Sequence, residues 1–139
     1  MEDLELRFIK LWERTGSRTS GPAVYRNLVW LYGQEHRFYH TMDHIEFCLG
    51  LFDKIKDRLE EPDIVELALI FHDAIYNPRN SFNEEQSAAY VTRAFKGNGI
   101  SEDVTKLILA SKHGRIEAMG DMAIFLDIDL AILGTKPEE

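Results

Sequence analysis

The chain has a single cysteine, Cys48, among its 139 residues, and this scarcity excludes two kinds of architecture. One thiol cannot form an internal disulfide framework, and it cannot supply a cysteine-based zinc cluster. The lack of disulfides is consistent with a reducing compartment, so we expect a cytoplasmic protein. Cys48 itself is expected to be a small residue of the core.

Basic residues are also few, with 16 Lys and Arg against 24 Asp and Glu and a formal net charge of -8. Binding along the backbone of a large nucleic acid usually needs a basic face, so we expect no such partner. A small nucleotide is still compatible with an acidic protein. No apolar run is long enough to span a bilayer and the N-terminus lacks a basic-then-apolar signal pattern, so we expect no membrane partner. The oligomeric state is not defined by the sequence.

Apolar residues recur at helical spacing along most of the chain, and sustained alternation is almost absent. This pattern predicts an all-α fold, a bundle of about seven helices that forms a single domain over residues 1–139. The expected helices cover 2–14, 22–32, 41–59, a fourth from 62 through His72 and Asp73, then 83–96, 101–113 and 122–133.

The stretch 66–76 is the centre of this prediction. Its first part is apolar at nearly every position, as in a central buried helix, and it ends on His72-Asp73. A buried carboxylate without a partner costs several kcal/mol, so a cation or donor is expected near Asp73.

The segment 124–130 has two interpretations. It is expected to be helical, but it could also be a buried strand with Asp127 and Asp129 on one face. The strand would suit a haloacid-dehalogenase-type phosphatase, which requires a parallel sheet and a nucleophilic Asp early in the chain. The all-helical pattern and the late position of these acids disfavour that class.

Three short patterns together suggest a metal site. His40 and His44 are spaced i, i+4 on one helix face, His72-Asp73 follows, and a late acid lies in an apolar run. Imidazole and carboxylate suit a divalent metal with positions open for water. Taken singly, the histidines could be surface or capping residues, and the late acid could pair with Arg37 or Lys112.

Four blocks of sequence carry a resemblance to a known family. RFYHTMDHI at 37–45, FHDAIY at 71–76, NEEQSA at 83–88 and LDIDLAILG at 126–134 resemble a bacterial family of HD-type phosphohydrolases, within the HD superfamily of metal-dependent enzymes. The blocks span about two thirds of the chain. The family continues with further helices, so this chain is expected to be a shortened form or a short member.

The resemblance implies an HD-domain-like bundle with a metal site between helices. By position, His44 matches the first ligand, His72 and Asp73 match the signature pair, and Asp129 matches the final ligand, with Asp127 as the alternative. Asp73 is also expected to take part in catalysis. The metal, one of Mn, Mg, Co, Ni, Fe or Zn, would activate water and polarise a phosphoryl oxygen.

Further residues are assigned expected roles by similarity or by charge. The pattern Tyr-His-x-x-x-His is similar to that of cyclic-nucleotide phosphodiesterases, which makes His40 a candidate general acid. His113 could bind a second metal or cap a helix. Glu84 could serve the metal or only begin a helix. The candidates for holding substrate phosphate are Arg37 and Lys112, with Arg79 a third cation to test.

The expected function is metal-dependent hydrolysis of a small, nucleotide-like phosphate ester, either a monoester or a diester. One alternative is a non-catalytic metal- or nucleotide-binding module on the same scaffold. Another is a di-iron oxygenase, which needs two irons and more histidine ligands, so it would depend on His113.

Overall fold

Helices account for all the regular structure in the computed structural model, which describes residues 3–34, 41–113 and 118–131. Within those ranges there is no strand, and the all-α prediction with about seven helices is confirmed. The elements are α1 (Leu4–Arg14), α2 (Gly21–Tyr32), α3 (Met42–Ile55), the 3₁₀-helix η1 (Lys56–Arg58), α4 (Pro62–Phe71), α5 (Asn83–Ala94), α6 (Ile100–His113) and α7 (Gly120–Ala131).

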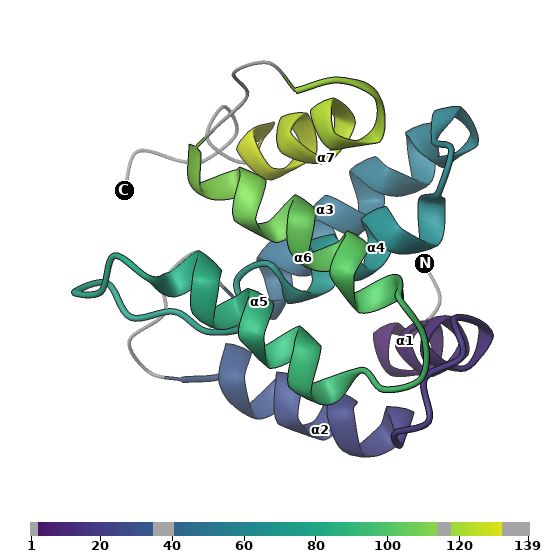
Figure 1. Ribbon diagram of the computed structural model, residues 1–139, viewed down its shortest axis with the longest axis vertical. Helices are drawn as coiled ribbons and strands as arrows, with labels where there is room; N and C mark the ends of the chain where they lie inside the picture. The colour runs from purple at the N-terminus through teal and green to yellow at the C-terminus, as the bar shows by residue number, and fades with distance from the viewer. Residues whose placement is uncertain (1–2, 35–40, 114–117, 132–139) are drawn as a thin grey trace.

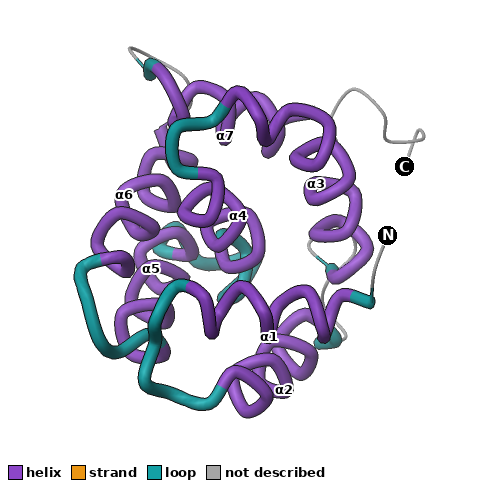
Figure 2. The backbone as a smooth tube through the Cα atoms, turned by 90° about the vertical axis from the view of Figure 1, so that its right-hand side faces the viewer, coloured by secondary structure: helices purple, strands orange, loops and turns teal. Residues whose placement is uncertain are grey.

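Helix α4 lies in the middle of the bundle. Every residue from Ile64 to Phe71 is buried, which fits a helix that is apolar on all sides. It packs against α3, α5, α6 and α7, and Figure 2 shows it surrounded by the other helices. Helix α7 lies across α6 and α3 at one end, while α1 and α2 lie at the other (Figure 1). Helix α4 is therefore enclosed by other helices over most of its length.

Aromatic side chains join α1 to this central helix. Phe8 and Trp12 stack with ring centroids 5.2 Å apart, and both contact the ring of Phe71 at 6.0 and 5.8 Å. Phe95, just after α5, meets Trp12 edge-on at 5.0 Å. These large buried rings fix α1 and the end of α5 against α4.

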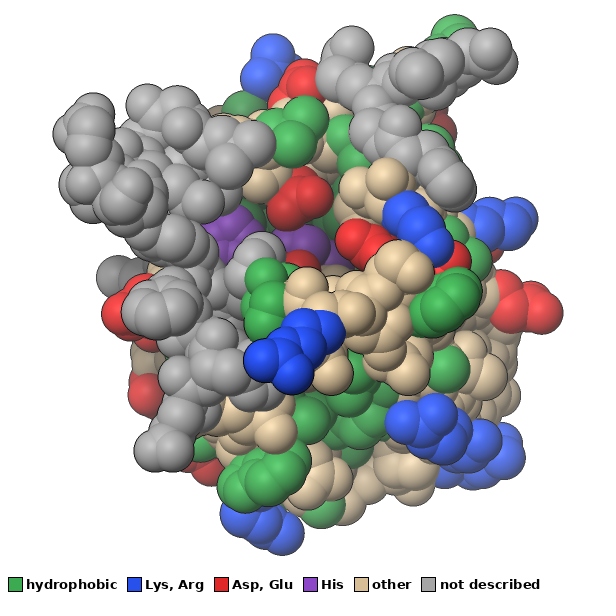
Figure 3. Space-filling view, turned by 90° about the vertical axis from the view of Figure 1, so that its left-hand side faces the viewer, with side chains coloured by type: hydrophobic (Ala, Val, Ile, Leu, Met, Phe, Trp, Pro, Cys, Tyr) green, Lys and Arg blue, Asp and Glu red, His purple; other side chains and the backbone are tan. Residues whose placement is uncertain are grey.

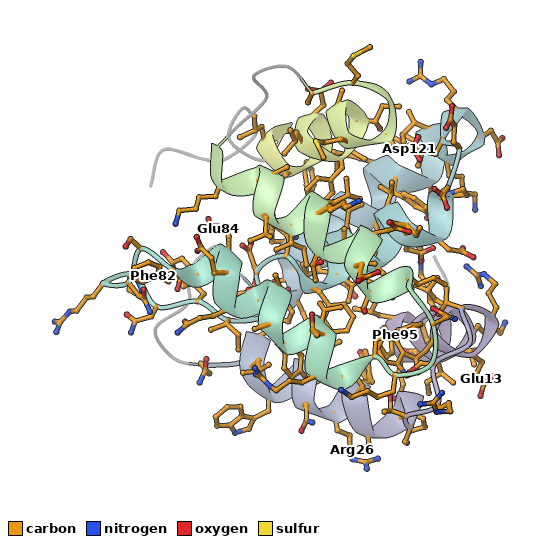
Figure 4. All side chains as sticks on the ribbon, in the orientation of Figure 1. Glu13, Arg26, Phe82, Glu84, Phe95 and Asp121 are labelled. Carbon is orange, nitrogen blue, oxygen red and sulfur yellow. The ribbon has the colours of Figure 1, made fainter. Side chains whose placement is uncertain are left out.

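The start of α7 is tied to the start of α4. Asp121, labelled in Figure 4, accepts hydrogen bonds from the backbone N–H groups of Glu60 and Glu61 at 2.9 and 2.8 Å. Both donors lie in the turn before α4, where a helix start leaves N–H groups unsatisfied. The two helices are thus held together at this end.

Two expected boundaries were wrong. Helix α3 ends at Ile55 and continues only as the short η1, and α4 ends at Phe71, so that His72 is its C-cap and Asp73 lies beyond it. The segment 124–130 is helical, which contradicts the strand interpretation and the dehalogenase-type site that required it. No helix within the described ranges has the length and apolar composition needed to cross a bilayer.

Candidate metal centre

Three helices bring the expected metal ligands to one place. His44 lies in the first turn of α3, His72 and Asp73 follow the last turn of α4, and Asp129 lies on α7. Ligand atoms of His44, His72 and Asp73 all lie within 4.8 Å of one another. Asp129 joins this group through His72, with Oδ1 2.9 Å from Nε2. We call these four residues the His-Asp cluster.

The position of His72 follows from where α4 ends. The last carbonyls of a helix have no partner within it, and Leu69 O accepts a hydrogen bond from His72 Nδ1 at 2.7 Å. Because a carbonyl only accepts, Nδ1 must carry the proton in this contact. The other nitrogen, Nε2, is then the atom available to a metal or to a second proton, an arrangement common for metal-binding histidines.

Two carboxylates face this nitrogen. His72 Nε2 lies 2.9 Å from Asp129 Oδ1 and 3.3 Å from Asp73 Oδ2, but it is not aligned for a hydrogen bond with any described residue. The His72 side chain is almost fully buried. A lone pair facing two negative charges in a buried site is unfavourable, so this point of the structure requires a cation.

In the metal-free protein that cation is a proton. Burial lowers the pKa of His72, but the charges of Asp73 and Asp129 outweigh burial and raise the pKa to about 10. The imidazole is therefore charged near neutral pH when no metal is bound. A divalent ion at the same place would have to displace this proton.

His44 faces the same carboxylate from α3. Its Nε2 lies 3.7 Å from Asp73 Oδ2, and its ring centroid lies 5.5 Å from that of His72. Cys48 Sγ, one helical turn further on, lies 3.7 Å from His44 Nε2. Burial raises the pKa of the Cys48 thiol, so it stays protonated at neutral pH. This fits the predicted core position of Cys48, although its closeness to His44 was not foreseen.

The donor set fits a divalent metal. Atoms bound to one ion at about 2.0–2.2 Å lie roughly 3.0–3.5 Å apart. Asp73 Oδ2 lies 3.3 Å from His72 Nε2 and 3.7 Å from His44 Nε2, and all three ligand atoms lie within 4.8 Å of one another. Two imidazoles and two carboxylates suit ions from Mn to Zn, and they suit Mg less well. In Figure 3, histidine side chains lie in a hollow of the surface, with acidic side chains beside it.

Asp127 and Asp129 differ in their exposure and in their distance from His72. On α7, Asp129 is half-buried beside His72, whereas Asp127 is exposed. The ring of Phe125, one turn before Asp129, meets the His72 ring edge-on at 6.0 Å. Helix α7 therefore places Asp129, and not Asp127, against the end of α4.

The other expected site residues either lie outside the described residues or make contacts away from the His-Asp cluster. Arg37 and His40 lie outside the described residues, and nothing is described of the His113 side chain at the end of α6. Lys112 Nζ binds Glu85 Oε2 at 2.7 Å and lies 5.3 Å from the centre of the Phe82 ring. Its charge is thus already paired within the protein.

Glu84 and Phe82 lie at the start of α5, as Figure 4 shows. Glu84 is in the first turn of that helix, where an acid suits the helix dipole. Within the part of the chain that the structure describes, no contact joins Glu84 to the His-Asp cluster, so its expected role at the metal stays a prediction.

One residue that positions the site was missed. Ser87 is fully buried on α5, and its hydroxyl accepts from Ile75 N–H at 3.0 Å and donates to Ile75 O at 3.2 Å. Both contacts hold the chain just after Asp73. A serine on the buried face of a helix was the available signal, because a buried hydroxyl needs partners.

The chain was compared with protein-family models, with curated proteins and with solved structures, and none of the three comparisons finds a match. The likeness to HD-type enzymes therefore depends on the sequence blocks named above.

Proposed function

We propose that this protein is a metal-dependent phosphohydrolase acting on a small phosphate ester, with a nucleotide-like compound as the expected substrate. The observation that carries the proposal is the buried Nε2 of His72, which faces Asp73 and Asp129 while Leu69 O holds Nδ1. The order His44, His72-Asp73, Asp129 along the chain is the order of the HD pattern.

Each residue has a defined task in this proposal. His44, His72, Asp73 and Asp129 would hold the ion. When bound, a divalent ion supplies a water of lowered pKa and offsets charge on the phosphoryl oxygens. Leu69 O keeps the His72 ring in the tautomer that presents Nε2. His40, which lies outside the described residues, is proposed to donate a proton to the leaving oxygen.

The first test is metal content by elemental analysis of the purified protein, after loading with Mn, Co, Ni or Zn. We expect near-stoichiometric metal in the natural protein and its loss in His72→Ala and Asp73→Ala. Asp57→Ala removes an exposed acid of η1 and is expected to keep the metal. Circular dichroism must show that all variants stay helical.

The second test is turnover of a panel of phosphate esters by the loaded protein. Hydrolysis that is lost in His72→Ala and kept in Asp57→Ala supports the proposal. Stoichiometric metal without turnover across mono- and diesters contradicts the hydrolase and favours a metal-binding module. Failure to bind any metal contradicts both.

A further inference from the structure

A pocket of about 770 Å³ opens beside the turn that carries His72 and Asp73. Ile75 and Tyr76, which line it, follow Asp73 after only one intervening residue. The other walls come from the end of α2, the segment 77–80 and the first turn of α5. Its volume is in the range of small-molecule sites, about 300–1,000 Å³.

The wall of this pocket has a charge pattern unlike that of the whole protein. Among the described residues that line it, none is acidic, although acids outnumber bases in the chain. One guanidinium, four carboxamides and a phenol supply its polar groups: Arg79, Gln34, Asn77, Asn80, Gln86 and Tyr76. Such a wall favours a ligand with one anionic group and an uncharged, hydrogen-bonding remainder.

The segment 77–83 is held in shape by its own asparagines. Asn77 Oδ1 accepts from Arg79 N–H at 3.0 Å, and Asn80 Oδ1 accepts from Phe82 N–H at 2.7 Å. Asn83 closes the loop, accepting from Asn77 N–H and donating to Asn77 O, both at 2.9 Å. A loop braced in this way loses less entropy on binding a ligand than an unbraced loop.

Hydrogen-bonding capacity is left over on the pocket side chains. The Arg79 guanidinium makes no ion pair with any residue of the described ranges. Gln86 accepts from Asn80 Nδ2 at 3.3 Å through Oε1, and its Nε2 donates to no described residue. An arginine binds phosphate through two parallel donors, and a carboxamide both donates and accepts.

We propose that this pocket binds a phosphate ester with an uncharged hydrogen-bonding remainder, with Arg79 as the phosphate-binding residue and Gln86 as a specificity-determining residue. The inference rests on the proposed function, because Ile75 and Tyr76 of the pocket wall follow His72-Asp73 closely in the chain. A nucleoside and a sugar both provide such a remainder, and the probes below distinguish them.

The test is calorimetric titration of the whole protein in excess chelator, so that no turnover occurs. The probes are adenosine 5′-monophosphate, ribose 5-phosphate, adenosine and inorganic phosphate. We expect at least one ester to bind about tenfold more tightly than adenosine and than inorganic phosphate. If adenosine 5′-monophosphate binds more tightly than ribose 5-phosphate, the remainder is a nucleoside. If the two esters bind equally, the remainder is the sugar.

Two variants and one control assign the residues. Arg79→Gln is expected to weaken ester binding about tenfold, and Gln86→Leu to weaken it severalfold while leaving inorganic phosphate unchanged. Arg58→Gln removes an exposed arginine of η1 and is expected to change nothing. Unaltered ester affinity in Arg79→Gln, or esters no tighter than inorganic phosphate, overturns the inference.

Ligand binding in the pocket and the proposed hydrolase function can be contradicted independently of each other. Ester binding in chelator without any metal binding would contradict the hydrolase and keep the pocket. Metal-dependent hydrolysis with an unchanged KM in Arg79→Gln would keep the hydrolase and overturn the pocket.

Discussion

His72 Nε2 and Asp129 Oδ1 lie 2.9 Å apart, which joins the end of α4 to the side of α7. The contact places a half-buried acid against a buried imidazole that already faces Asp73. It also provides a direct comparison on one helix, because Asp127 has the same chemistry on the exposed side of α7.

We expect Asp129→Asn to weaken binding of Zn or Mn by about 10–100-fold, since the amide keeps the shape and loses the charge. Asp127→Asn is the matched control and should change affinity less than about twofold. Titration against a competing metal indicator measures both. Equal losses in the two variants would show that Asp129 acts only through the net charge of the helix.

The stability of the metal-free protein should depend on pH through His72. Its pKa of about 10 is higher than the value of about 6.5 in the unfolded chain, so the folded state binds the extra proton between these values. This stabilisation is complete below pH 6.5 and is lost as the pH rises toward 10. Between pH 6.5 and 9 we expect a fall on the order of 3 kcal/mol, or roughly 10 °C in melting temperature.

Thermal unfolding in chelator at pH 6.5, 7.5 and 9 measures this effect. His72→Gln cannot be protonated and should show a flatter pH profile. The comparison stops at pH 9 because burial also raises the pKa of Cys48, whose thiol adds a loss of the same sign at higher pH. A natural protein that gains stability over this range would refute the assignment.

Much of this arrangement could be predicted from sequence, and the reasons for the failures are local. The apolar run before His72 identified the central helix, because a helix that is apolar on all sides is buried on all sides. The end of α4 was placed too late, since the apolar pattern continues through Ala74 and Ile75 with no Gly or Pro to mark a stop. On a helix, residues two apart such as Asp127 and Asp129 lie on nearly opposite sides, but only the packing of Phe125 and Ile128 decides which side faces inward.

Glu66 shows a different limit of the sequence. It lies in the same apolar run as His72, and it is buried, yet nothing nearby in sequence identified its partner. That partner is Arg7, whose Nε donates to Glu66 Oε2 at 2.6 Å while its two terminal nitrogens bind Asp53 at 2.8 and 3.0 Å. Such long-range charge pairing depends on how α1 packs on α4.

Arg7→Leu should destabilise the protein by about 3–5 kcal/mol, because it leaves the charge of Glu66 buried and without Arg7. Arg14→Leu removes a half-exposed arginine that pairs with Asp63 at 2.9 Å and lies 3.7 Å from Glu66 Oε1. Because Arg7 still pairs with Glu66 in this variant, the change should cost less than about 1 kcal/mol. Urea unfolding measures both. The double variant Arg7→Leu/Glu66→Leu should recover part of the loss, and no recovery would contradict a charge-burial origin.

Ser87 offers a test of how α5 positions the cluster. Ser87→Ala leaves the N–H and C=O of Ile75 without the hydroxyl that binds both, which should cost about 1–3 kcal/mol. Because Ile75 follows Asp73 closely, metal affinity should also fall, by severalfold. Ser111→Ala is the control, since that hydroxyl donates to Ile108 O within its own helix at 2.6 Å. If Ser87→Ala loses stability in urea but binds metal as tightly as the natural protein, then Ser87 stabilises the fold without positioning Asp73.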